Sequence, residues 1–211
     1  MEDTEKTKAA IKEQELLAKK NRALLEKYPI LKPYGYYEAD EEYDYTWTEL
    51  DRVPKGWHDM FLRLCDRIQE HLKAKGVPLT EFHFFDIKEK WGTLRIEVTG
   101  YSDDEIQEML FDADAESMLY CPVCGGPSKC VTKGYVLYTC VNCAEKELKL
   151  TYDMLTKKDR PIWKEYNYET KQGTEKPTKY DAQFLSQWDA PVEDVAGEEG
   201  TAAPQVPGAS E

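Results

Sequence analysis

The chain has 211 residues and a net charge of −13, so it is acidic as a whole and long enough for one domain with tails. It contains no run of about 18 apolar residues, so we expect no membrane-spanning helix. Three of the first six residues are acidic and no apolar stretch follows them, so we expect no secretory signal and a cytoplasmic protein.

The acidic residues are concentrated in three segments, residues 33–51, 102–116 and 190–211, which hold 19 acidic residues and no Lys or Arg. The rest of the chain has 28 basic and 22 acidic residues, a net charge of +6. A uniformly acidic surface repels nucleic acid. A patchy one can attract a basic surface of another protein, so the charge pattern favours protein binding.

Residues 1–31 are predicted to form a charged helical arm. Ala10, Leu17 and Leu24 lie seven residues apart, and the Tyr28-Pro29 pair ends the helical pattern. The apolar stripe is thin, so the helix is expected to be unstable alone. It is either a solvated arm or a helix that docks on a partner or on a second copy, which would give a homo-oligomer through residues 1–28.

Residues 32–56 are predicted to form an acidic aromatic loop, because they show neither helical nor strand periodicity. So many aromatic residues rarely remain in water. The loop therefore either packs across the domain or exposes an acidic, aromatic binding surface. In the second case Tyr43, Tyr45 and Trp47 are candidate partner contacts.

Residues 57–160 are predicted to form an α+β core that includes a zinc module at about residues 117–158. Apolar residues of the segment 57–73 follow helical spacing on one face. A β-hairpin follows, with strands near residues 81–87 and 93–98, where apolar and polar residues alternate. We expect the apolar face of the hairpin to pack on this helix.

The hairpin contains the least ordinary stretch of the chain, Lys88-Glu89-Lys90 followed by Trp91. We expect these three charges in a turn of four to five residues that ends at Gly92. Trp91 either caps the core or offers a contact surface. The candidate partner-binding residues here are Lys88, Lys90, Trp91 and Arg95.

The acidic segment 102–116 is predicted to be a helix that starts with a capping box formed by Ser102 and Glu105. Its apolar residues, such as Ile106 and Leu110, fall on one side. Its acidic residues are expected in the first turns and on the solvated outer face.

The strongest motif is C-x2-C-x15-C-x2-C, formed by Cys121, Cys124, Cys140 and Cys143. Two intervening residues let both sulfurs of a pair converge on one ion, and four thiolates form a closed tetrahedral site with no position for water. The sequence therefore predicts one structural Zn²⁺. A mononuclear iron-sulfur site and a disulfide pair are the alternatives, and a protein that is not exported favours metal over disulfide.

Gly134 divides the segment between the cysteine pairs into two short strands, and residues 144–155 have apolar positions at helical spacing. A knuckle, a hairpin and ligands on the first turn of a helix indicate a treble-clef-like module. Cys130 has no partner at the same spacing, so it is predicted to be a spare thiol, with ligand exchange as the alternative.

Residues 161–211 are predicted to be an aromatic and then low-complexity tail that is largely disordered, because its last part combines Ala, Pro and Gly with acidic residues. Aromatic residues in the first part, among them Trp163, Phe184 and Trp188, could still contact the domain or a partner.

No catalytic motif accompanies the cysteines. Zinc deaminases need a His-x-Glu motif and an open position on zinc, and none of the three His residues lies near the cysteines. The sequence also has no P-loop, nucleophile elbow or dinucleotide fingerprint. A non-enzymatic protein is therefore favoured, and an enzyme that uses carboxylates is the remaining alternative.

The order of these motifs resembles a family of small, uncharacterised phage and bacterial proteins with a KEKFG-x-LR core followed by C-x-x-C zinc knuckles. The resemblance covers about residues 57–145 and rests on the string IKEKWGTLRIEV, with Trp91 in place of Phe. It implies a phage or mobile-element setting and a location in the host cytoplasm. It also implies a protein that binds host machinery, and it carries over no catalytic residues.

The sequence therefore predicts a zinc-stabilised, non-enzymatic module that binds and modulates host proteins. Mimicry of nucleic acid by the acidic segments is one variant of this function. The alternative is a nucleic-acid-binding regulator, in which Lys88, Lys90 and Arg95 form a basic face and Trp91 stacks on a base.

Overall fold

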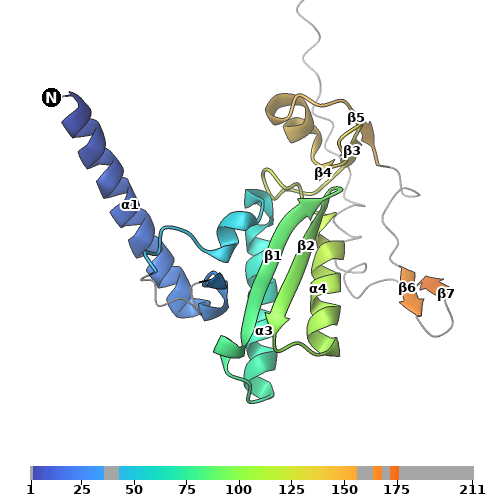
Figure 1. Cartoon of the computed structure of the whole chain (residues 1–211). Helices are drawn as coiled ribbons and strands as arrows, with labels where there is room; N and C mark the ends of the chain where they lie inside the picture. The colour runs from blue at the N-terminus through green and yellow to red at the C-terminus, as the bar shows by residue number, and fades with distance from the viewer. Residues whose placement is uncertain (1, 36–42, 156–163, 168–171, 176–211) are drawn as a thin grey trace, which may run out of the picture.

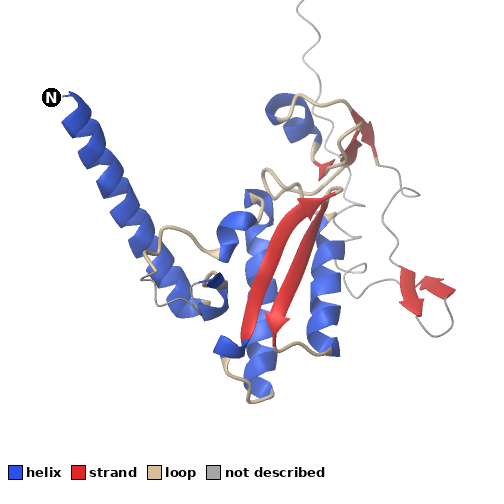
Figure 2. Ribbon diagram, in the orientation of Figure 1, coloured by secondary structure: helices blue, strands red, loops and turns tan. Residues whose placement is uncertain are grey.

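The computed structural model describes residues 2–35, 43–155, 164–167 and 172–175. A long β-hairpin packs on two helices, and a small three-stranded sheet lies beyond the turn of this hairpin (Figure 1, Figure 2). The protein is therefore of mixed helix and sheet (α+β) architecture, as predicted. Within the described residues, no helix is long and apolar enough to cross a membrane.

The helices are α1 (Glu2–Lys27), α3 (His58–Ala74), α4 (Asp104–Ser117) and the short π-helix η5 (Cys143–Glu147). Short 3-10 helices are η1 (Pro29–Leu31), η2 (Glu49–Arg52), η3 (Lys55–Trp57) and η4 (Leu79–Glu81). The strands are β1 (Phe82–Lys90), β2 (Thr93–Gly100), β3 (Cys130–Thr132), β4 (Tyr138–Thr139), β5 (Tyr152–Met154), β6 (Lys164–Asn167) and β7 (Gln172–Glu175).

The apolar stripe predicted on residues 57–73 forms the centre of the core. Phe61, Ile68 and Leu72 of α3 are fully buried. The ring centroid of Phe61 lies 5.2 Å from that of Phe84 in β1, so the hairpin packs directly on α3. Each large apolar side chain buried in this way contributes about 1.5–3 kcal/mol.

A β-bulge changes the face to which β1 directs its side chains. The pairing with β2 shifts between Phe84 and Asp86, so Phe85 is an extra residue and is 56% exposed. A regular alternation over residues 81–87, as the sequence predicts, would place Phe85 and Ile87 on one face, which is wrong. The bulge shifts the alternation by one residue, so that Ile87 is buried together with Phe84.

The turn of the hairpin is tighter than predicted. β1 continues to Lys90 and β2 starts at Thr93, so the turn contains only Trp91 and Gly92, with φ of +54° and +83°. Two consecutive positive φ angles fit the type I′ turn, whose twist matches that of a hairpin. Residues 88–90 therefore belong to a strand, and their prediction as part of the turn is wrong.

The cap of α4 is one residue later than predicted. The Asp103 carboxylate accepts a hydrogen bond from the Ile106 amide at 3.0 Å and caps the helix. Asp is as effective as Ser at an N-cap. The predicted capping box of Ser102 and Glu105 is therefore wrong, and the Ser102 hydroxyl accepts from Gln107 instead.

Three acidic residues in the second half of α4 are buried, although the sequence placed its acids on a solvated face. Each meets an arginine of a neighbouring element, and the pairs are Arg67–Asp112 at 3.2 Å, Arg95–Asp114 at 2.5 Å and Arg63–Glu116 at 2.5 Å. A buried carboxylate is costly unless a cation pairs with it. These pairs therefore help to fix α4 against α3 and β2.

Two further contacts hold the hairpin to its surroundings. The Ser117 hydroxyl at the end of α4 accepts from the Leu94 amide of β2 at 2.9 Å and donates to the Asp114 carbonyl at 2.5 Å. On the other strand, the Arg52 guanidinium of η2 donates to the Phe85 carbonyl at 3.2 Å.

The predicted N-terminal helix is present as α1, and its first part projects away from the domain (Figure 1). Its last turns contact the domain, because Asn21 donates to the Tyr45 carbonyl at 2.8 Å and Gln69 of α3 donates to the Lys27 carbonyl at 3.3 Å. Leu16 is 69% exposed, so the apolar residues of the projecting part remain uncovered by the described residues.

In the predicted tail, β6 and β7 pair as a short antiparallel hairpin, with Lys164 opposite Glu175. The sequence analysis predicted this segment to be largely disordered and did not predict the two strands. The predictions for Trp163, Phe184 and Trp188, and for the acidic residues between 38 and 42, lie outside the described residues.

Candidate metal centre and exposed aromatic rim

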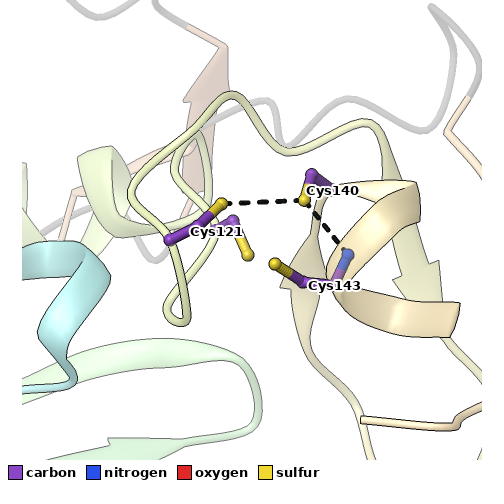
Figure 3. Close-up of side chains that lie close together, drawn as sticks. Cys121, Cys140 and Cys143 are labelled. Carbon is purple, nitrogen blue, oxygen red and sulfur yellow. Dashed lines mark hydrogen bonds between the residues drawn. The ribbon is translucent and has the colours of Figure 1, made fainter. Parts of the chain in front are cut away.

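The cysteines of the two C-x-x-C pairs come together in one cluster. Their four Sγ atoms all lie within 4.8 Å of one another, and the Sγ atoms of Cys124 and Cys140 are 3.7 Å apart. The sulfurs of Cys121, Cys140 and Cys143 converge on a common space (Figure 3). Cys121 and Cys143 are buried, whereas Cys124 is exposed. The cluster could hold a metal ion close to the surface.

The first cysteine pair lies on a tight backbone turn. The Cys121 amide donates to the Gly126 carbonyl at 2.7 Å, and the Gly125 amide donates back to the Cys121 carbonyl at 2.9 Å. Gly125 has a φ of +77°, which residues with a side chain resist. The Gly126 amide lies 3.4 Å from the Cys124 sulfur, so the turn directs a donor at a candidate metal-ligand atom.

The second pair lies at the start of a helical segment. The Cys143 amide donates to the Cys140 sulfur at 3.4 Å (Figure 3), and the Ala144 amide donates to the Cys140 carbonyl at 3.0 Å. Backbone amides at the start of a helix stabilise a thiolate. The two pairs thus supply amide donors to sulfurs on both sides of the cluster.

The pKa values of the thiols reflect this environment. Burial raises the pKa of Cys121, but hydrogen bonds from the Thr139 hydroxyl, 2.9 Å away, and from nearby amides lower it to about 7. Burial and the neighbouring sulfurs raise the pKa of Cys140 and Cys143. A bound cation would remove the repulsion between thiolates, because a metal binds the deprotonated form.

The helix predicted over residues 144–155 is only partly present. It ends with η5, Lys149 turns the chain with a φ of +52°, and Tyr152–Met154 forms β5 beside β3. The short apolar run fits a strand as well as a helix, and the pairing with β3 decides between them.

Cys130 lies outside the cluster of four sulfurs. This position agrees with the prediction that it is a spare thiol. It is fully buried in β3, and its thiol donates to the Thr139 carbonyl at 3.2 Å. Burial raises its pKa to about 11, so it remains protonated at neutral pH.

The first knuckle is hydrogen-bonded to η3, which directly precedes α3. The Gly56 amide donates to the Pro122 carbonyl at 2.8 Å, and the Trp57 indole donates to the Tyr120 carbonyl at 2.8 Å. A Cβ atom on Gly56 would lie 2.1 Å from the Cys121 carbonyl oxygen. The sequence analysis missed Gly56, for which the only signal is a glycine directly before a Trp-led helix.

The second hairpin, β3–β4, meets the turn of the β1–β2 hairpin. A Cβ atom on Gly92 would lie 2.9 Å from the Tyr138 ring and 3.2 Å from the Val136 carbonyl. Glu89 joins the two turns, because its carboxylate accepts from the Gly92 amide at 2.6 Å and from the Tyr135 hydroxyl. Both turns are therefore held in a fixed relation to each other.

Three apolar side chains at these turns remain exposed, Trp91 at 72%, Tyr135 at 61% and Val136 at 36%. We call this group the aromatic rim. Trp91 is therefore exposed and does not cap the core, and its role as a contact surface stays a prediction.

Two of the three cations predicted to form a basic face are engaged in ion pairs. Lys88 pairs with Asp86 and lies 3.9 Å from Glu97, and Arg95 pairs with the buried Asp114. Only Lys90 points its charge at the rim, with its Nζ atom 5.0 Å from the centre of the Trp91 ring. The predicted basic face is therefore partly neutralised, because carboxylates of β1, β2 and α4 pair with two of its three cations.

The aromatic contacts predicted in residues 43–47 pack on the domain. Tyr43 is buried, and its hydroxyl donates to the Trp47 carbonyl. Tyr45 is half-buried, with its ring 4.5 Å from the Tyr43 ring and 4.0 Å from the Arg22 guanidinium. Of the two alternatives for this loop, the described part supports packing across the domain.

Comparison of the chain with known protein families, with curated proteins and with solved structures finds no match.

Proposed function

We propose that the protein is a non-enzymatic, zinc-stabilised module that binds other proteins through the aromatic rim. The observation that carries this proposal is Trp91, which is 72% exposed at a positive φ. The left-handed conformation raises the free energy of a residue with a Cβ atom by about 1–2 kcal/mol. Because the Trp91 side chain is mostly exposed, its packing offsets little of this cost. A strained backbone at an exposed residue that gains little from packing is typical of functional positions.

The residue types of the rim fit a protein interface. Trp and Tyr are the residues most enriched where binding energy is concentrated, because they bury a large area at low entropic cost. Glu89 already fixes the turns that carry them. The rim therefore has little conformational freedom to lose on binding.

Zinc is the metal that we propose for this site. Four thiolates in a closed cluster select zinc or iron, and zinc prefers a tetrahedron with Zn–S distances of about 2.3 Å. Such a tetrahedron has S–S edges of about 3.8 Å, and the sulfurs of Cys124 and Cys140 are 3.7 Å apart. We propose that Zn²⁺ is structural here and that knuckle, hairpin and helical turn form a treble-clef-like module.

We further propose a phage or mobile-element protein that acts in the host cytoplasm on host proteins, in keeping with the resemblance of its central motif. Capture from bacterial lysate with the full chain tests the binding function. We expect a partner that the wild type and Phe85→Ala retain and that Trp91→Ala loses. Phe85 is the matched control, because it is exposed on the same hairpin outside the rim. Equal capture by both variants would contradict the proposal.

A second candidate function is nucleic-acid binding, which the exposed Trp91 with Lys90 beside its ring still allows. The ion pairs of Lys88 and Arg95 weaken it. A titration with a labelled single strand at low salt tests this candidate, because binding through phosphates must fall steeply as salt rises. Mimicry of nucleic acid would instead appear as competition between the protein and DNA for a common partner.

A further inference from the structure

The aromatic rim is uncovered within the described part of the chain, and hydrogen bonds of Glu89 join the two turns that carry it. Trp91 and Tyr135 come from different hairpins, and the Glu89 carboxylate binds both turns. The rim offers one cation that no carboxylate of the described residues neutralises, because Lys90 has its ammonium over the Trp91 ring without an ion pair. The second nearby cation, Lys133, pairs with the exposed Asp153.

These features define the chemistry of an occupant. The occupant needs apolar side chains to cover Trp91, Tyr135 and Val136. It also needs a carboxylate for Lys90, because an unpaired ammonium beside an aromatic surface attracts acidic groups.

The C-terminal part of this same chain has that chemistry. Residues 181–194 read DAQFLSQWDAPVED, with four acidic residues and no Lys or Arg. Phe184, Leu185 and Trp188 form an apolar group, and Asp189 directly follows it. The stretch thus combines aromatic side chains with an excess of negative charge.

The length of chain permits contact with the rim. Leu155 ends the described core beside β3, where its amide donates to the Lys129 carbonyl at 3.0 Å. Trp188 follows 33 residues later. The β6–β7 hairpin folds residues 164–175 back on themselves, and the remaining 21 residues still span up to about 70 Å when extended. Because the segment is tethered, it meets the rim at a high effective concentration without a second molecule.

We propose that residues 181–194 dock on the aromatic rim of their own chain, with the apolar group against Trp91 and Tyr135 and an acidic residue beside Lys90. The docked segment competes with an external partner, so its release regulates binding. This regulation rests on the proposed function of the rim as the partner-binding surface.

Site-specific photocrosslinking in the full chain tests the proposal. The change Trp91→p-benzoylphenylalanine places the crosslinker in the rim, and Phe85→p-benzoylphenylalanine is the control on the same hairpin. We expect irradiation of the purified protein to join position 91, but not position 85, to residues 181–194 within a monomer. Mass spectrometry of the digested monomer band identifies the joined peptides.

Charge reversal checks the role of Lys90. Lys90→Glu and Asp189→Lys should each lower the yield of the crosslink by about tenfold, because like charges then face each other. The double variant should restore it. A crosslink that is absent from the tail, insensitive to these charges or found only in a dimer band overturns the proposal.

The same crosslinker separates this proposal from the proposed function. Crosslinks from position 91 to another protein in bacterial lysate, with none to the tail, support the partner-binding surface and overturn only the tail docking. Crosslinks to the tail, together with equal partner capture by wild type and Trp91→Ala, overturn the proposed function and leave the docking intact.

Discussion

The amide of Gly56 donates a hydrogen bond to the carbonyl of Pro122, 2.8 Å away, and so joins η3, which directly precedes α3, to the first cysteine knuckle. The backbones touch, since the Cβ of any other residue at position 56 would lie 2.1 Å from the Cys121 carbonyl oxygen. A metal ion held by the cysteines would therefore be coupled to the folding of the helical core through one glycine.

The first prediction concerns this contact. Gly56→Ala should displace the knuckle and lower the affinity for zinc by at least about tenfold, an effect comparable with the loss of a residue that supports a ligand. Competition with a chromophoric chelator measures the affinity, and thermal unfolding measures the stability. Gly35→Ala is the matched control, because no atom lies within 4 Å of the added Cβ. Equal affinities of the two variants would contradict the coupling.

The second prediction distinguishes ligands from the fifth cysteine of this region. Cys140→Ser should lose the metal ion, whereas Cys130→Ser should retain one ion per chain, because its sulfur lies outside the cluster and bonds to the Thr139 carbonyl. Elemental analysis of the purified proteins gives the ratio of metal to protein. Retention of a full equivalent by Cys140→Ser would exclude that residue as a ligand, and loss in Cys130→Ser would indicate ligand exchange.

The third prediction is a dependence of stability on pH that comes from Glu49. This carboxyl group is 2% exposed, and burial raises its pKa from 4.5 to about 7. A raised pKa in the folded state means that its contribution is fully present below pH 4.5 and is lost as the pH rises to about 7. The loss is about 3 kcal/mol at most.

Glu49→Gln tests this dependence, because the amide does not ionise. The stabilities of the wild type and the variant should be similar near pH 4.5, and the variant should become the more stable one by pH 8. Urea denaturation across this range gives both curves. Parallel curves would show that Glu49 ionises in the folded protein as it does in the unfolded one.

The fourth prediction concerns Arg95, which the sequence suggested as a nucleic-acid contact. Burial raises the pKa of the Asp114 carboxyl, and Arg95, whose guanidinium lies 2.5 Å away, opposes this effect. Arg95→Met should therefore destabilise the fold by about 2–3 kcal/mol, because it leaves a buried carboxylate without its cation. Adding Asp114→Asn should recover most of the loss.

Lys88→Met is the control for this pair, since its partner Asp86 is half-exposed and such pairs contribute less than about 1 kcal/mol. Denaturant titration measures all three variants. A stable Arg95→Met protein with weaker binding to a labelled oligonucleotide would favour the nucleic-acid function instead.

The fifth prediction separates stability from binding at Trp91. Trp91→Asn should stabilise the fold by about 1 kcal/mol, because Asn tolerates the left-handed turn and the lost indole is exposed. It should also remove binding of a partner at the rim. Phe85→Asn, which changes an exposed aromatic residue outside the turn, should do neither. A loss of stability in Trp91→Asn would indicate that the indole packs on the fold.

The sequence predicted the parts of the fold that depend on local periodicity. The apolar stripe of α3, the existence of the hairpin and the convergence of the two cysteine pairs follow from spacing alone. The tight turn was missed because Trp91 occupies a position that Gly, Asn or Asp would normally mark. The bulge at Phe85 was missed because an extra residue has no fixed sequence signal.

Features that depend on distant contacts could not be predicted. β5 forms by pairing with β3, where Cys130 lies opposite Met154. The acids of α4 are buried because arginines of α3 and β2 reach them, and Gly56 matters because Pro122 lies against it. Each feature joins segments at least 19 residues apart in the chain, where local propensity carries no information.

The bonds made by Ser117 and Arg52 have a consequence for how copies and partners can meet. The Ser117 hydroxyl accepts a hydrogen bond from the Leu94 amide at one edge of the two-stranded sheet, and the Arg52 guanidinium donates one to the Phe85 carbonyl at the other edge. Sheet edges with unpaired backbone groups are where strands of other molecules add and where aggregation begins. Because one backbone group at each edge is already bonded, addition of a partner strand is disfavoured, and recognition by the side chains at the tip of the hairpin is favoured.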